Sequence, residues 1–129
     1  AAQRAVLLRT LEQEVETVQQ AIFTEPDDSS CWLFQRWLLA WGHAALGSEA
    51  IEAVVAGVVD NCRELLEDDE GVKWAMLTLL HCASMCPGCL AEAPESVANL
   101  LARLIEIDPD HSGYYEDVVG GKVGHFVRA

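Results

Sequence analysis

The sequence predicts an all-α protein, a right-handed array of three helical hairpins. Apolar residues recur at spacings of three and four along most of the chain, which is the periodicity of one helix face. A large aromatic residue also recurs: Trp74 lies 42 residues after Trp32, and Tyr115 lies 41 residues after Trp74. This period exceeds the roughly 34 residues of tetratricopeptide hairpins and indicates repeats that stack on one another. An ordinary bundle of helical hairpins is the alternative interpretation.

The first repeat is predicted over residues 3–46. A helix is expected over 2–23, because its apolar residues share one face. The acidic turn that contains Pro26 ends this helix, and Ser29 or Ser30 is the expected N-cap of the next one. The second helix carries more aromatic bulk than a solvated helix keeps, so we expect it at the centre of the core.

The second repeat is predicted over residues 49–86. Gly47 and Ser48 are expected to end one helix and to cap the next, which should run to about Glu67. Acidic residues then precede the fourth helix, where negative charge favours the helix dipole. The Pro87-Gly88 pair is expected to end that helix.

The third repeat is predicted over residues 94–119, followed by a tail over 120–129. Pro94 is expected as the first residue of the fifth helix, and a second proline-containing acidic turn, 108–110, should close it. A short sixth helix should begin near Ser112. We expect a single helical-repeat domain over 1–129. The chain begins without methionine inside a predicted helix, so we expect it to be a fragment of a longer chain.

Composition narrows the function classes. The formal net charge is -13, from 21 acidic and 8 basic residues, which argues against nucleic-acid and anionic-membrane partners. The apolar fraction of 51% argues against a disordered chain. No apolar run reaches the roughly 18 to 20 residues of a spanning helix. Five cysteines, an odd number on helical faces, suit buried thiols in a reducing, cytoplasmic compartment.

Three segments resemble the repeats of protein prenyltransferase α subunits. Residues 23–39 read FTEPDDSSCWLFQRWLL, which closely resembles the repeat motif of that family. Residues 62–67 with Lys73-Trp74, and 104–109 with 114–117, resemble the next and the closing repeats of the type II (Rab geranylgeranyltransferase) α subunit. The resemblance covers about residues 12–117, in the order of the family. Gln35 departs from it, because the family usually has a basic residue there.

The resemblance implies a fold and a function. In this family the α subunit is an α-α superhelix, a crescent of hairpins around a β subunit that holds the zinc and the isoprenoid pocket. This chain is then expected to scaffold the β subunit for geranylgeranyl transfer to C-terminal cysteines of Rab proteins. The expected partners are the β subunit, the Rab escort protein and Rab.

The same resemblance assigns no cofactor and no catalytic residue to this segment. The family's diphosphate-assisting lysine belongs to an early repeat, and neither Lys73 nor Lys122 matches that position. Two alternatives stay open: a non-catalytic, tetratricopeptide-like adaptor that binds a peptide or partner helix, and the α subunit shared by the farnesyl and type I enzymes.

Aromatic and arginine side chains are the candidate interaction residues, because these types dominate binding energy at protein contacts. Core packing between repeats is the alternative role, and for tryptophan it is the favoured one. The guanidinium of Arg36 is expected to pair with Asp68 or Asp69 if it does not face a partner. The six candidates for the repeat core or the interface are Trp32, Arg36, Trp37, Trp74, Tyr114 and Tyr115.

A cluster of soft ligands raises the question of zinc. His81, Cys82, Cys86 and Cys89 lie within nine residues, and the last two have the two-residue gap of many zinc sites. No second pair follows at finger spacing, and the surroundings are apolar. Buried thiols that fill gaps between helices are therefore the favoured interpretation, and no metal site is expected.

Overall fold

A computed structural model of the chain describes residues 2–86 and 97–119. Within these residues the chain forms six α-helices and one 3₁₀-helix. The helices are α1 (Ala2–Thr24), α2 (Ser29–Leu46), α3 (Ser48–Glu67), α4 (Val72–Met85), α5 (Val97–Ile107), the 3₁₀-helix η2 (Pro109–His111) and α6 (Ser112–Val119). None of the described helices is long and apolar enough to cross a membrane.

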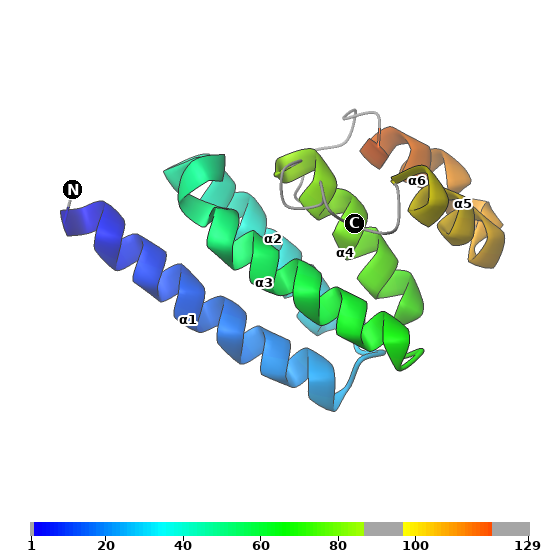
Figure 1. Cartoon of the computed structure of the whole chain (residues 1–129), viewed down its shortest axis with the longest axis horizontal. Coiled ribbons are helices and arrows are strands. Elements are labelled where there is room, and N and C mark those ends of the chain that lie inside the picture. Colours follow the sequence, from blue (N-terminus) through cyan, green and yellow to red (C-terminus); the bar gives the residue numbers. More distant parts are fainter. Residues whose placement is uncertain (1, 87–96, 120–129) are drawn as a thin grey trace.

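The helices pack as sequential hairpins (Figure 1). Each helix contacts the next one in the chain, and α1 also contacts α3, α2 contacts α4, and α4 contacts α6. Contacts with both the next and the second-next helix are typical of repeat arrays, where each hairpin covers the apolar face of its neighbour. The prediction of an all-helical array of hairpins is confirmed.

Two predicted caps were wrong by one residue. The N-cap of α2 is Asp28, whose carboxylate accepts a hydrogen bond from the backbone N–H of Ser30 at 2.9 Å. Ser48 is the first residue of α3, and Gly47 before it has a positive φ of 88°. Asp, like Ser, is a preferred N-cap residue, so composition alone does not choose between neighbours. The predicted roles of Pro87-Gly88 and Pro94 fall outside the described residues.

The turns of the first two hairpins meet at Gly71. This glycine has φ of 54°, and a Cβ at its position would lie 2.8 Å from the carbonyl oxygen of Pro26. The same Cβ would lie 3.4 Å from the indole of Trp32. The backbone there adopts a left-handed conformation and approaches another turn closely, and glycine tolerates both conditions without strain.

Helix α4 lies at the centre of the core. It contacts α2, α3, α5 and α6, and every residue from Ala75 to Cys82 is buried. A helix that is buried on all sides carries apolar residues around its whole circumference. The core therefore centres on α4, although the sequence predicted α2.

Candidate functional site

Helix α2 has one buried and one exposed face. Trp32 is 1% exposed, and Gln35 and Arg36 are each 2% exposed. Phe34 and Trp37, by contrast, are 44% and 42% exposed. Five positions in an α-helix correspond to a rotation of about 140°, so Trp32 and Trp37 point to nearly opposite sides. The first anchors the repeat, and the second is available to a partner.

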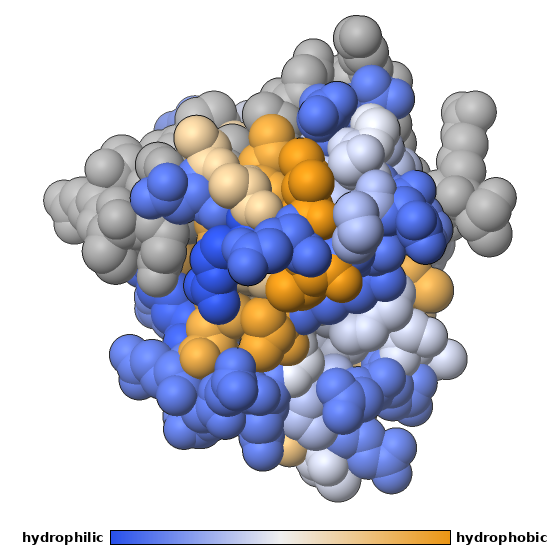
Figure 2. All heavy atoms as spheres, turned by 90° about the vertical axis from the view of Figure 1, so that its right-hand side faces the viewer, coloured by the Kyte–Doolittle hydropathy of each residue, from blue (hydrophilic) through white to orange (hydrophobic). Residues whose placement is uncertain are grey.

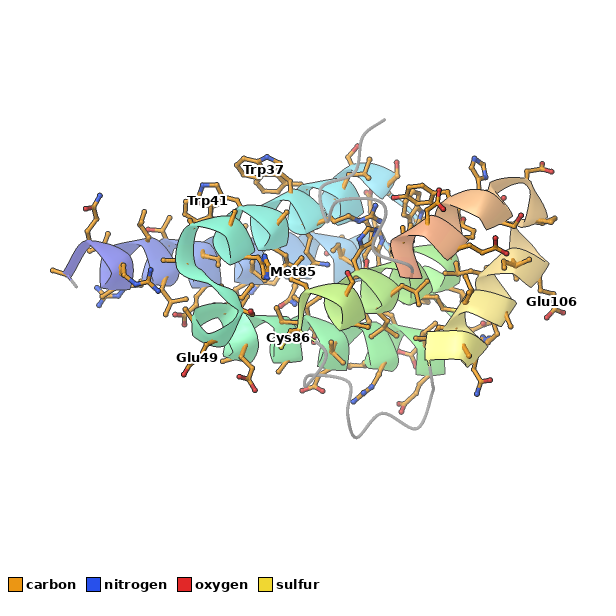
Figure 3. All side chains as sticks on the ribbon, turned by 90° about the horizontal axis from the view of Figure 1, so that it is seen from above. Trp37, Trp41, Glu49, Met85, Cys86 and Glu106 are labelled. Carbon is orange, nitrogen blue, oxygen red and sulfur yellow. The ribbon has the colours of Figure 1, made fainter. Side chains whose placement is uncertain are left out.

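Three aromatic residues of α2 line the same groove and form what we call the aromatic surface: the exposed Phe34 and Trp37, and the half-buried Trp41. The rings of Phe34 and Trp37 are stacked, with centroids 6.0 Å apart and planes inclined by 10°. Trp37 and Trp41 project from the outer side of α2, away from α3 and α4 (Figure 3).

A shallow groove of about 240 Å³ lies along the aromatic surface, between α1 and α2. Its lining is mostly apolar, and its acidic residue is Glu14. The lining residues are Thr10, Leu11, Glu14, Phe34, Trp37, Leu38 and Trp41. Such a groove, apolar with an aromatic wall, has the composition of the central part of a protein interface.

Arg36 points into the molecule. Its Nε and one terminal nitrogen have no hydrogen-bond partner among the described residues. Burial lowers the pKa of this guanidinium to about 10, against the opposing effects of the nearby Tyr114, Cys82 and Tyr115. The predicted pairing with Asp68 or Asp69 is therefore wrong. The reason is geometric: the Arg36 side chain lies beside Cys82 of α4 and Tyr114 of α6, whereas both aspartates are exposed in the turn after α3.

Tyr115 is buried and anchors the start of α6. Its hydroxyl donates a hydrogen bond of 2.6 Å to the Asp108 carboxylate, which also forms an ion pair with Lys73 at 3.0 Å and lies 3.0 Å from Nδ1 of His111. These bonds, from Tyr115 first, then His111 and Lys73, hold the pKa of Asp108 well below its usual range. Burial and the Asp108 carboxylate together raise the pKa of Tyr115. Tyr114 meets the Tyr115 ring edge-on at 5.8 Å between centroids.

Trp74 is half-buried and packs against the core. The ammonium of Lys73 lies 5.4 Å from the centroid of its ring, within the range of a cation–π contact. The structure thus brings Arg36, Tyr114 and Tyr115 together inside the molecule. Trp37 lies apart from them on the surface. Trp32 and Trp74 lie near the turns that precede α2 and α4.

Within the described residues, the cysteines form no metal site. Cys62 and Cys82 are buried free thiols, and Cys31 is a half-buried one. Cys86 takes part in a disulfide, so the prediction of a free thiol is wrong there; Cys89 lies outside the described residues. Among residues 2–86 and 97–119, no group of three potential ligands is arranged to hold a metal ion.

A second groove, of about 250 Å³, runs between α1 and α3. Its walls carry Glu12 and Glu16, while Val15 and Val54 contribute apolar surface. Gly57 leaves open space there, since a Cβ at this position would meet no atom within 4 Å. We call it the acidic groove.

Apolar side chains also gather at the end of the array formed by α5 and α6. Figure 2 shows them at the centre of that face, with polar side chains around them. On α5, Ile107 is 51% exposed, while Leu101 and Ile105 are partly buried. Exposed apolar side chains of the described residues thus lie at this end, on α2 and, through Val6 and Phe23, on α1.

The sequence analysis did not single out Phe34, Trp41 or Asp108. The signal for the first two was present: Phe34, Trp37 and Trp41 follow one another at steps of three and four, so they share a face that excludes Trp32. Asp108 carried only a turn signal. Its role depends on Lys73, a residue 35 positions earlier, and no local pattern reveals such a contact.

Known proteins identify the relationship. The chain is 31% identical over 112 residues to geranylgeranyl transferase type-2 subunit alpha of Dictyostelium discoideum, covering 87% of this chain and 35% of that protein. It is 29% identical to the same subunit of Schizosaccharomyces pombe, covering 88% of this chain and 37% of that protein. The chain is homologous to the alpha subunit of geranylgeranyl transferase type 2.

The homology confirms the resemblance seen in the sequence. The chain spans about a third of the length of the curated relatives it matches. No protein-family model matches the sequence. The packing of helices in sequential hairpins agrees with the repeats expected of a prenyltransferase alpha subunit.

Proposed function

We propose that this chain is a structural part of a type-2 geranylgeranyl transferase, in which its hairpins help to hold the β subunit. The complex would transfer a geranylgeranyl group to C-terminal cysteines of Rab proteins in the cytoplasm. The proposal rests on the homology to two type-2 alpha subunits. The zinc and the isoprenoid pocket would belong to the β subunit, and this chain would contribute architecture.

The aromatic surface is the part of this chain that we assign to the β subunit. Phe34 and Trp37 leave more than two fifths of their surface exposed. For an aromatic side chain that buries 150–250 Å², this fraction is roughly 60 to 110 Å², worth about 2 kcal/mol per residue on burial. Stacking already orders the two rings, so less side-chain entropy is lost on binding.

The acidic groove supports a second contact. Glu12 and Glu16 line it, and the net charge of -13 strengthens the negative potential around it. A groove with one sign of charge attracts segments of the opposite sign and raises the rate of association. We assign it to a basic segment of the Rab escort protein or of Rab, the other partners that the family implies.

Co-purification of the full-length protein with its β subunit tests the proposal. Wild type should recover the β subunit and show geranylgeranyl transfer to a Rab protein. Trp37→Ala and Phe34→Ala should weaken β-subunit binding by 10-fold or more, since interface hot spots cost about 2 kcal/mol or more when truncated.

Ile107→Ala is the matched control, because Ile107 is equally exposed but lies at the far end of the array. It should leave binding unchanged. If Trp37→Ala and Phe34→Ala both bind the β subunit as tightly as wild type does, the aromatic surface is not part of the interface. Failure of wild type to recover any β subunit would favour the adaptor function instead.

A further inference from the structure

The acidic groove has both charged and apolar walls. It lies between α1 and α3, which run side by side (Figure 1), and its volume is about 250 Å³. Glu12 and Glu16 line it with carboxylates, and Val15 and Val54 line it with apolar surface. Small-molecule sites usually have volumes of roughly 300 to 1,000 Å³, so this groove has the size for a single side chain. A side chain that matches both kinds of wall has an apolar stem and a cationic tip.

The two carboxylates lie one helical turn apart and have no cationic partner. Residues four positions apart on a helix have Cβ atoms about 5–6 Å apart, and like charges at this spacing destabilise the helix. Both glutamates are exposed, and neither forms an ion pair with any described residue. The pair does not stabilise the fold, whereas a cation between the two carboxylates would offset their repulsion.

Gly57 is a second feature of this groove that the fold alone does not require. It lies in the interior of α3, where glycine is less favourable than alanine. Its φ is not positive, and a Cβ at this position would meet no atom within 4 Å. Neither backbone conformation nor close packing therefore calls for glycine, and the missing side chain leaves that part of the groove open. Natural sequences accept such locally unfavourable choices mainly at functional sites.

We propose that the acidic groove binds one lysine side chain of the protein substrate, with its stem over Gly57 and its ammonium between Glu12 and Glu16. An ammonium is a compact charge with three donors and can bond to two separate carboxylates, whereas the planar guanidinium of arginine matches one carboxylate. The inference rests on the proposed function, in which Rab is the substrate, and narrows the assignment of this groove to Rab. Exposed charges act mainly on the rate of association. This suits a substrate, because its product must leave after each reaction.

Steady-state kinetics of the full-length protein in complex with its β subunit test the inference, with Rab as the varied substrate and the Rab escort protein at a fixed, saturating concentration. Glu12→Gln and Glu16→Gln should each raise the KM for Rab about 2- to 5-fold, and the double variant further, with kcat unchanged. These differences should shrink at about 1 M salt, where the Debye length is about 3 Å. The Tm of each variant should equal or exceed that of wild type, because the substitution relieves the repulsion.

Two further measurements test the shape of the site and the choice of lysine. Gly57→Leu fills the open part of the groove with a good helix former, so it should raise the KM for Rab without lowering the Tm. A hexalysine peptide should compete with Rab on wild type, and about 3-fold or more less well on the double variant. A hexaarginine peptide that competes better than hexalysine would overturn the choice of lysine.

Glu106→Gln is the matched control, because it removes the same charge from an exposed position on α5, outside the groove. It should leave the KM unchanged. An equal rise of KM in this control, a fall of kcat at unchanged KM, or a change that follows the concentration of the escort protein instead of Rab would overturn the inference. If wild type transfers the prenyl group and the double variant keeps the wild-type KM, this inference alone fails. If wild type shows no transfer, the proposed function fails.

Discussion

The first and the last hairpins hold their proline-containing turns in different ways. In the first, the indole of Trp32 donates a hydrogen bond of 2.7 Å to the backbone carbonyl of Pro26, six residues earlier. In the last, the hydroxyl of Tyr115 donates to the carboxylate of Asp108, seven residues earlier. The repeated aromatic residue therefore does the same work twice: its polar end bonds to the turn, and its ring packs beneath it.

The acceptors differ, and the difference decides how each turn responds to its surroundings. A backbone carbonyl carries no ionisable charge, so the hydrogen bond from Trp32 to Pro26 does not depend on the protonation of its acceptor. Asp108 is a carboxylate that also binds Lys73 and His111, so the last turn depends on a charge. The two hairpins thus share one geometry, in which an aromatic side chain donates a hydrogen bond to the turn. They differ in the acceptor, which is a backbone carbonyl in one and a carboxylate in the other.

Removal of Trp32 should break the first turn and give the largest effect. Trp32→Ala deletes a buried ring and should lower the free energy of unfolding by about 3–5 kcal/mol. Urea denaturation followed by circular dichroism measures it. Trp32→Phe keeps a buried ring but loses the donor and part of the ring volume, so it should cost less, about 1–3 kcal/mol. Equal losses in the two variants would show that the hydrogen bond, and not the ring, holds the turn.

Gly71→Ala should disturb the same turn from the neighbouring repeat. Its Cβ would meet the Pro26 carbonyl oxygen at 2.8 Å on a backbone with positive φ, and such strain costs about 1–3 kcal/mol. The Tm measured by calorimetry should fall accordingly. Gly57→Ala is the control: its Cβ meets nothing within 4 Å, and alanine in a helix interior is favoured by about 0.5–1 kcal/mol.

Asp108→Asn should loosen the last turn without touching the first. The amide keeps the shape but loses the charge that binds Lys73 and His111, so we expect a loss on the order of 1 kcal/mol. Amide hydrogen exchange should quicken in α6 and stay unchanged in α1 and α2. Equal changes in both regions would mean that the turns do not act independently.

The same carboxylate should make the last turn acid-sensitive. The pKa of Asp108 is lowered in the folded state, so its contribution is complete above the unfolded value of about 3.9 and is lost as the pH falls below it. Stability of wild type should therefore decline from about pH 4 downward more steeply than that of Asp108→Asn. Parallel pH profiles would contradict the role of the charge.

Trp37→Ala should have the smallest effect on stability, although it removes the same side chain as Trp32→Ala on the same helix. Exposed positions away from special features usually change stability by less than about 0.5 kcal/mol, and the partial burial of Trp37 adds a little to this. Urea denaturation should place it close to wild type. A loss as large as that of Trp32→Ala would show that the aromatic surface is part of the fold.

The helices and their order followed from the sequence because local signals determine them. Spacings of three and four located α1 to α4 and the described parts of α5 and α6, and the aromatic period located the repeats. Trp32 and Tyr115 recur because each serves its own turn. Contacts between residues distant in the chain could not be predicted from the sequence. Lys73 contacts Asp108, and Arg36 faces Tyr114 and Cys82, only because the hairpins stack on one another.

The candidate site was predicted in part. The sequence analysis gave Trp37 as a possible contact residue but favoured core packing for all the tryptophans. Sequence patterns do not show which face of a helix is left uncovered by the other helices. The choice between Trp32 and Trp37 needed the position of α4, which covers one face of α2 and leaves the other. Gln35, which departs from the family pattern, lies on the buried face of α2, and that position also could not be assigned from the sequence.

The contact between Gly71 and Pro26 has a mechanical consequence. At that point the backbone of one turn approaches the carbonyl oxygen of Pro26 in the other, beside the Pro26 ring and the Trp32 indole. The first two hairpins therefore have little room to move closer together at this end, because tightly packed atoms resist further approach. We therefore expect motion of one hairpin against the other to be smaller at this end than at the opposite end of the helices.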